Sequence, residues 1–195
     1  MRTLRTVVPF LVVSLMFVLS VVVSTQGNKG GNGDDGSKIQ IGYEIAPVPL
    51  DMKGKNPALV GLGSYIVNGQ GDCAGCHSTP TYAPGGDPHL GQLERISVPT
   101  YLSGGGDLFG PFVPRNLTPN ADGLPANLDL ETFLLVLDTG ADVKHRAPAV
   151  PSASQDLLQV MPWPVFGKMT HREKVAIYEY LRAIPCLGSD TRCGR

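Results

Sequence analysis

Two cysteines and a histidine stand together near the middle of the chain, in the order Cys73-Ala74-Gly75-Cys76-His77. Two thiols three positions apart can each form a thioether bond to one vinyl group of a haem, and the adjacent histidine then lies beneath the iron as an axial ligand. The spacing therefore predicts one covalently bound c-type haem, attached through Cys73 and Cys76, with His77 as the fifth iron ligand.

Three other uses of the same cysteines compete with this interpretation. A zinc site would draw on all four cysteines of the chain, but six residues separate Cys186 from Cys193, which is wider than the usual spacing within a zinc pair. A thiol-disulfide exchange motif is expected between a buried strand and a helix, whereas the segment before Cys73 has a helical pattern. A disulfide between Cys73 and Cys76 leaves His77 without a role.

The sixth iron ligand is sought among the methionines, because a thioether sulfur stabilises reduced iron. Met161 is the preferred candidate, since it lies in a short loop that two following prolines stiffen, nine positions before the start of a predicted helix. Met169 stands directly before that helix, where an apolar residue often packs against its own helix. His89, His145 and a vacant sixth position remain as alternatives.

The segment that leads to the haem motif is predicted to be a helix. Asn56 suits the N-cap with Pro57 at the first helical position, and apolar residues then recur at helical spacing until Gly69. Gly61 and Gly63 weaken such a helix by about 1 kcal/mol each. A close crossing with another helix is therefore expected at these two glycines.

The crossing partner is expected near the carboxyl end of the chain. Thr170 and Glu173 match a capping box, which opens a helix that Pro185 ends. Apolar residues recur in this segment at intervals of three and four, so one face of the helix is available to pack.

A third helix is predicted over residues 129–139, with Asp129 as N-cap and Gly140 as its end. Residues 79–126 are rich in glycine and proline without a sustained period, which is typical of a long loop that wraps a ligand. The expected fold class is all-α, with three or more helices around one haem. The segment 137–159 is longer than such a fold needs, and no pattern in it indicates a role.

The amino-terminal part carries an uncharged apolar run, Val7–Val23, after two arginines. This run is long for a signal peptide and short for a membrane span, so residues 1–25 are either a signal peptide or an uncleaved signal anchor. Residues 26–38 are polar and glycine-rich and are predicted to form a flexible linker. Residues 39–195 then form one monohaem domain in the periplasm or another extracytoplasmic space, with tethering to the inner membrane as the alternative.

Composition sets limits on the partners. The chain has 195 residues, 42% of them hydrophobic, and a formal net charge of −1. That charge excludes the basic surface typical of nucleic-acid binding. Cys186 and Cys193 are predicted to form a disulfide, as expected in an exported protein, worth roughly 2.5 kcal/mol. Asn116-Leu117-Thr118 also matches a glycosylation sequon, which is interpreted as chance.

With these residues identified, the chain resembles class I cytochrome c domains over residues 57–185, and it is most similar to the cytochrome subunits of periplasmic alcohol and sugar-acid dehydrogenases. The resemblance rests on Gly63-Ser64-Tyr65-Ile66-Val67, Asp72-Cys73-Ala74-Gly75-Cys76-His77, Arg115-Asn116-Leu117-Thr118-Pro119, Met161-Pro162-Trp163 and the helix containing Ile177-Tyr178-Glu179-Tyr180-Leu181-Arg182. It implies the class I cytochrome c fold, with Met161 as the distal ligand and the terminal helices crossing near the haem edge. Those subunits commonly contain several haem motifs, whereas this chain has one.

Two functions are carried forward. The first is a one-electron carrier without an enzyme activity, relaying electrons between a periplasmic dehydrogenase or similar donor and a cytochrome or oxidase acceptor. The second is a haem enzyme or sensor with an open sixth position, in which His89 or His145 supplies the distal acid-base group. Arg115 and Trp163 are interpreted either as contacts of the haem propionates or ring, or as an exposed arginine and a core tryptophan.

Overall fold

The computed structural model describes residues 33–105, 110–142, 157–188 and 193, with side chains from residue 35 onward. The chain divides into residues 1–31 and residues 32–195, and all described residues belong to the second unit. The predicted signal peptide or anchor and residues 26–32 of the predicted linker therefore lie outside the described part.

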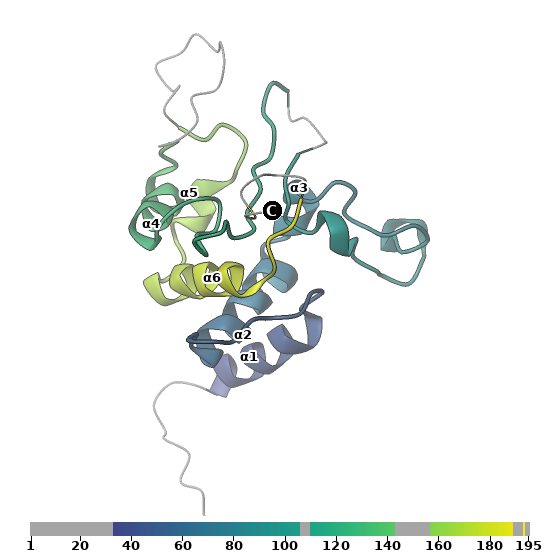
Figure 1. Cartoon of the computed structure of the whole chain (residues 1–195), viewed down its shortest axis with the longest axis horizontal. Helices are drawn as coiled ribbons and strands as arrows, with labels where there is room; N and C mark the ends of the chain where they lie inside the picture. Colours follow the sequence, from purple (N-terminus) through teal and green to yellow (C-terminus); the bar gives the residue numbers. More distant parts are fainter. Residues whose placement is uncertain (1–32, 106–109, 143–156, 189–192, 194–195) are drawn as a thin grey trace, which may run out of the picture. The chain divides into compact units, whose positions relative to one another are not determined.

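The second unit is mostly helical, and its described residues form no β-sheet (Figure 1). The all-α prediction is confirmed at this level. No helix within the described ranges combines the length and the apolar character needed to cross a bilayer. The α-helices are α1 (Gly33–Ile45), α2 (Pro57–Tyr65), α3 (Cys73–His77), α4 (Leu130–Thr139), α5 (Trp163–Phe166) and α6 (His171–Ala183), with a π turn over Ile66–Gln70 and 3-10 turns over Pro88–Leu90 and Val98–Thr100.

The three predicted helices begin at the predicted caps. The side-chain oxygen of Asn56 accepts hydrogen bonds from two amides in the first turn of α2, at 3.0 and 3.4 Å. Asp129 caps α4 in the same way at 2.8 Å, and Gly140 ends that helix in the left-handed conformation. At α6 the capping box is complete, because the Thr170 amide donates to Glu173 and the Glu173 amide donates to the Thr170 hydroxyl.

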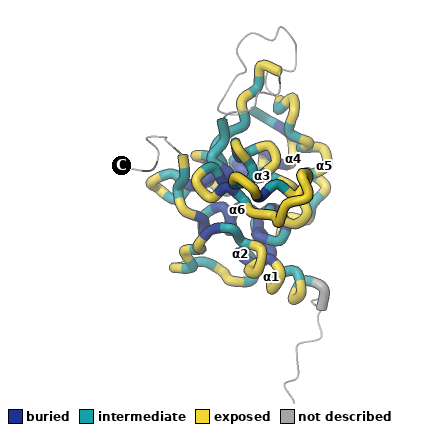
Figure 2. Tube along the Cα trace, turned by 90° about the vertical axis from the view of Figure 1, so that its right-hand side faces the viewer, coloured by how far each residue is buried: buried dark blue, intermediate teal, exposed yellow. Residues whose placement is uncertain are grey.

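The crossing of α2 and α6 is the centre of the core. A Cβ atom on Gly63 would lie 1.9 Å from the Ala176 carbonyl oxygen and 2.7 Å from the Tyr180 Cβ, so only glycine permits this approach. The prediction of a close crossing at Gly63 is confirmed. The α4 and α5 helices also pack together, and α4 contacts α6. The buried stretches of α2 and α6 appear in dark blue in Figure 2.

The α1 helix was not expected from the sequence. It begins at Gly33, so residues 33–38 are helical and the prediction of a flexible linker over that part is wrong. The helix is held by tertiary contacts. A Cβ on Gly42 would lie 1.9 Å from the Gly61 carbonyl oxygen, and Asp35 forms an ion pair with Arg172 of α6. Gly61 therefore faces α1 and not α6, which corrects the expectation that both glycines of α2 meet the last helix.

Candidate functional site

The predicted attachment residues lie on one short helix, α3. It follows the π turn that extends α2 and begins after Asp72, whose φ is +44°. Residues separated by three and four positions share a face of a helix. The side chains of Cys73, Cys76 and His77 therefore share one face of α3. Gly75 on the same turn is confined by Asp72, because a Cβ there would lie 2.6 Å from a carboxylate oxygen of that residue.

The two thiols of α3 are free but differ in environment. Cys73 is partly buried and Cys76 is exposed. Burial, together with the negative charge of Asp72, raises the pKa of Cys73 to about 12. The same two causes raise the pKa of Cys76. Both sulfurs are consequently protonated thiols at neutral pH, and Cys76 is the more exposed of the two residues.

The His77 ring is oriented by a backbone group. Its Nδ1 lies 2.7 Å from the Arg115 carbonyl oxygen, 38 positions later in the chain. A carbonyl only accepts, so Nδ1 carries the proton and donates it. Burial lowers the pKa of His77, and it outweighs the opposite effect of this hydrogen bond. The imidazole is therefore neutral, with its Nε2 lone pair available for a metal ion, which is the arrangement that an axial histidine requires.

The Arg115 backbone is itself fixed against the segment that follows α3. The Gly104 amide donates to the His77 carbonyl at 2.8 Å, and the Gly105 amide donates to the Pro114 carbonyl at 2.9 Å. Gly104 has a φ of +71°, and a Cβ on it would lie 2.4 Å from the carbonyl carbon of Arg115. Glycine at this position permits the close approach that brings the Arg115 carbonyl to His77.

Arg115 and Trp163, for which the sequence allows two interpretations each, both contact other residues of the protein. The Arg115 guanidinium forms an ion pair with Asp142, and both side chains are largely buried, at 23% and 11% exposed. Trp163 packs on the carboxyl end of α4, where a Cβ on Gly140 would lie 2.3 Å from the indole ring. Arg115 is thus neither exposed nor unpaired, and Trp163 is partly buried against α4 and is not a member of the hydrophobic core.

The two candidate methionines are both partly buried and pack against the hydrophobic core. Met161 precedes α5, and its carbonyl accepts a hydrogen bond from the Trp163 amide at 2.8 Å. Met169 precedes the Thr170 cap of α6, as the sequence indicated. Because the two sulfurs have similar exposure, the choice of Met161 as distal ligand remains a prediction.

The alternative ligands fare differently. His89 lies on an exposed 3-10 turn, where its ring contacts Tyr82 edge-on at 6.2 Å, and His145 lies outside the described residues. Cys186 and Cys193 form the predicted disulfide, which removes both from any four-cysteine zinc site. Across the described ranges no three His, Cys, Asp or Glu side chains gather in a way that could hold a metal ion.

A buried polar cluster beside Cys73 was missed by sequence reasoning. The Tyr101 hydroxyl lies 2.5 Å from the Asn68 carboxamide oxygen and 2.8 Å from the Tyr180 hydroxyl, and Asn68 also bonds Ser64. Burial raises the pKa of Tyr101 and Tyr180, and a charge on Cys73 raises both further. These residues are far apart in sequence, so no local pattern could have identified the cluster.

The candidate site of the second unit thus comprises α3 with its two thiols, the backbone carbonyl that bonds His77, and the partly buried methionines before α5 and α6. Comparisons with family models, with curated proteins and with solved structures found no match to this chain.

Proposed function

We propose that this chain is an exported one-electron carrier with a single c-type haem and the class I cytochrome c fold. Cys73 and Cys76 would hold the haem through thioether bonds, and His77 and Met161 would be its axial ligands. When bound, the haem supplies a reversible Fe(III)/Fe(II) couple. The observation that carries this proposal is the hydrogen bond from His77 Nδ1 to the Arg115 carbonyl oxygen.

That hydrogen bond matters because it places the proton on Nδ1 and leaves Nε2 as the nitrogen that could bind iron. The second nitrogen of a metal-bound imidazole is normally bonded to a carbonyl or carboxylate, which fixes the tautomer and the ring plane. Here the bond occurs on the histidine that directly follows two cysteines at haem-attachment spacing. The thiols and the imidazole share a face of α3, so the donor set fits a covalently attached haem.

The other residues of the site have supporting roles. The crossing of α2 and α6 is tightly packed, and Val60, Ala176 and Leu181 are almost fully buried in it. A haem packed against such apolar surface would be shielded from water, which would favour the reduced state of its iron. An electron then leaves to a partner protein, since the chain carries a single haem motif. We propose an extracytoplasmic dehydrogenase or similar donor and a cytochrome or oxidase acceptor.

The direct test is expression of the full chain together with a c-type haem-attachment system. The expected product is coloured, contains one haem per chain that survives denaturation, and shows the absorption of a haem without vinyl groups. Replacement of both Cys73 and Cys76 by serine should abolish covalent attachment. Colourless wild-type protein would refute the proposal.

The distal ligand is tested with a matched pair of variants. In the oxidised protein, Met161→Ala should remove the weak far-red band that iron-methionine coordination produces, whereas Met169→Ala should keep it. The ferrous wild-type protein should also fail to bind carbon monoxide, because the sixth position is filled. Carbon monoxide binding by the wild-type protein would support the alternative function, a haem enzyme or sensor with an open site.

A further inference from the structure

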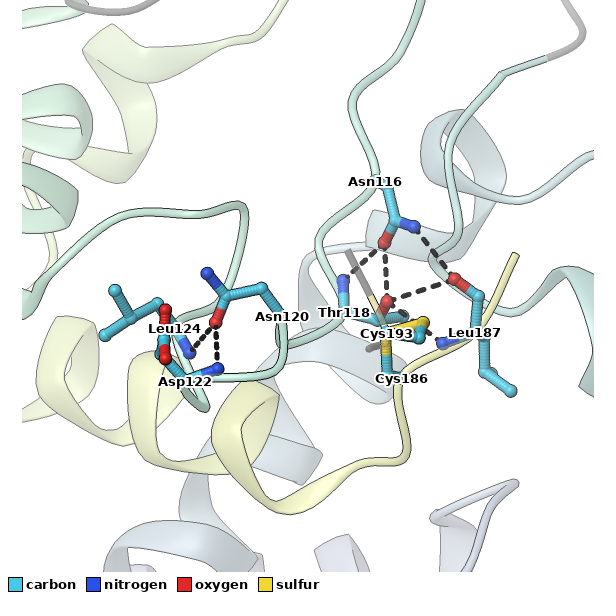
Figure 3. The surroundings of a disulfide bond; sticks show 8 residues. All are labelled: Asn116, Thr118, Asn120, Asp122, Leu124, Cys186, Leu187 and Cys193. Atoms are coloured by element: carbon cyan, nitrogen blue, oxygen red, sulfur yellow. Dashed lines mark hydrogen bonds between the residues drawn. A yellow bond between two sulfur atoms is a disulfide. The ribbon is translucent and has the colours of Figure 1, made fainter. Parts of the chain in front are cut away.

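Leu187, which lies inside the loop closed by the Cys186–Cys193 disulfide, bonds Asn116 and Thr118 (Figure 3). The α6 helix ends at Ala183, and the chain continues through Pro185 to the Cys186–Cys193 disulfide. Leu187, directly inside this loop, contacts the segment 116–118 through its backbone. Residue 116 follows Arg115, whose carbonyl oxygen accepts from His77. Two elements that are distant in sequence therefore meet one residue away from Arg115, whose carbonyl oxygen bonds His77.

The side chains of Asn116 and Thr118 make this contact, and their polar groups are hydrogen-bonded. The side-chain nitrogen of Asn116 donates to the Leu187 carbonyl at 2.9 Å, and the backbone amide of Leu187 donates to the Thr118 hydroxyl at 3.2 Å. The Thr118 hydroxyl and amide both donate to the Asn116 carboxamide oxygen, at 2.6 and 2.8 Å. Thr118 is 1% exposed, so these bonds are shielded from water.

A neighbouring turn shows what is specific to this arrangement. Asn120 also accepts two amide hydrogen bonds with its side chain, from Asp122 and Leu124 at 2.9 Å each, but these serve its own turn (Figure 3). Asn116 has the same local function and in addition bonds Leu187 across the fold. The hydrogen bond from Asn116 to Leu187 is therefore not a consequence of the turn type.

We propose that Asn116 and Thr118 are positioning residues that connect the Cys186–Cys193 loop to the axial histidine and thereby tune the haem. By holding Leu187, they fix the backbone at residue 115, and the Arg115 carbonyl stays within 2.7 Å of His77 Nδ1. A firm hydrogen bond at Nδ1 makes the imidazole a stronger electron donor to a metal. The inference rests on the proposed function for its haem readout, but the connection itself exists without a haem.

The path between the loop and the histidine is short and rigid. The Leu117 amide donates to the Leu102 carbonyl at 2.8 Å, and Gly188 lies against Asn116 and Ser103, with a Cβ there 3.2 Å from the Asn116 amide nitrogen. Backbone hydrogen bonds join the segments 102–105 and 114–118, and the side chains of Asn116 and Thr118 join the segment 116–118 to Leu187. A displacement of Leu187 is therefore expected to reach residue 115 through Asn116.

The first measurement is the midpoint potential of the holoprotein in two pairs of variants. Thr118→Val keeps the shape of the side chain but removes its hydroxyl, and Thr118→Ser keeps the hydroxyl. Asn116→Ala breaks the hydrogen bond to Leu187, whereas Asn120→Ala breaks bonds within its own turn and one to Asn127, none of which involves Leu187. We expect the potential to rise in Thr118→Val and Asn116→Ala, because a weaker bond at Nδ1 stabilises ferric iron less. Thr118→Ser and Asn120→Ala should keep the wild-type potential.

The second measurement is amide hydrogen exchange at Leu117 and Thr118, with Cys186 and Cys193 both replaced by alanine. Exchange should become roughly tenfold faster at these amides when the loop is open. Opening the loop should shift the midpoint potential, and adding Thr118→Val should shift it no further, since both changes break the same contact between Leu187 and the segment 116–118. Unchanged exchange, or an equal shift of the potential in Asn120→Ala, would overturn the inference.

The two proposals fail in different ways. If the chain carries no haem, the wild-type protein has no haem potential, and the proposed function fails. Hydrogen exchange at Leu117 and Thr118 still reports whether the disulfide loop holds the segment 116–118. If the haem is present and the exchange rates are unaffected by opening the loop, the carrier function stands and the positioning role is lost.

Discussion

Replacing Gly63 by alanine should destabilise the protein, although alanine is the better helix former. The new Cβ would lie 1.9 Å from the Ala176 carbonyl oxygen, whereas ordinary contact begins near 3.4 Å, so the two helices must separate by about 1.5 Å. Such overpacking costs about 3 kcal/mol, at the upper end of the usual range, because a gap of this size also weakens the contacts around it. The gain in helix propensity is about 1 kcal/mol. The net loss is about 2 kcal/mol.

The assay is urea or thermal unfolding of the purified protein, followed by far-UV circular dichroism. A loss of about 2 kcal/mol corresponds to a fall of about 4–8 °C in Tm for a chain of this size. Gly36→Ala is the matched control, because Gly36 lies in α1 with nothing within 4 Å of its Cβ position. This control should be stabilised by about 0.5–1 kcal/mol. Gly63→Ala protein as stable as the wild type would refute the argument from close crossing.

Three further outcomes follow from the structure. Burial raises the pKa of Tyr101 and Tyr180, so their contribution to the free energy of unfolding should be fully present below the ordinary tyrosine pKa near 10 and be lost as the pH rises above it. Spectrophotometric titration should find that both phenols ionise only on unfolding. Tyr180→Phe should reduce the loss of stability at high pH. Thr170→Ala removes the capping box and should cost about 1 kcal/mol in urea unfolding, with equal stability counting against the cap. In folded haem-free protein, a thiol reagent should modify Cys76 about tenfold faster than Cys73, and equal rates would contradict the difference in burial.

The helices that could be predicted are those whose signals are local. Asn56, Asp129 and the Thr170-Glu173 pair cap their own first turns, so a few neighbouring residues determine where each helix begins. The α1 helix could not be predicted in this way. Its sequence is rich in glycine and has no clear apolar period, and it is helical because Gly42 packs against α2 and Asp35 pairs with Arg172.

In the candidate site, too, the features with local sequence signals could be predicted and those that depend on distant residues could not. The spacing of Cys73, Cys76 and His77 is local and could be recognised in the sequence. The group that orients His77 is a backbone carbonyl 38 positions away, and a backbone carbonyl has no residue type that could signal it. The contact of Asn116 and Thr118 with Leu187 could not be predicted either, since Leu187 lies about 70 positions later in the chain.

The spacing of contacts along the chain suggests an order of assembly. The α1 and α2 helices are neighbours in sequence and pair locally, whereas Ala176 follows its contact Gly63 by 113 positions. In a chain that emerges amino-terminus first, the α1-α2 pair and the two thiols of α3 appear long before α6. Local contacts form faster than such distant ones. Tyr180 arrives with α6, so the hydrogen-bonded cluster of Asn68, Tyr101 and Tyr180 is completed only when the last helix docks.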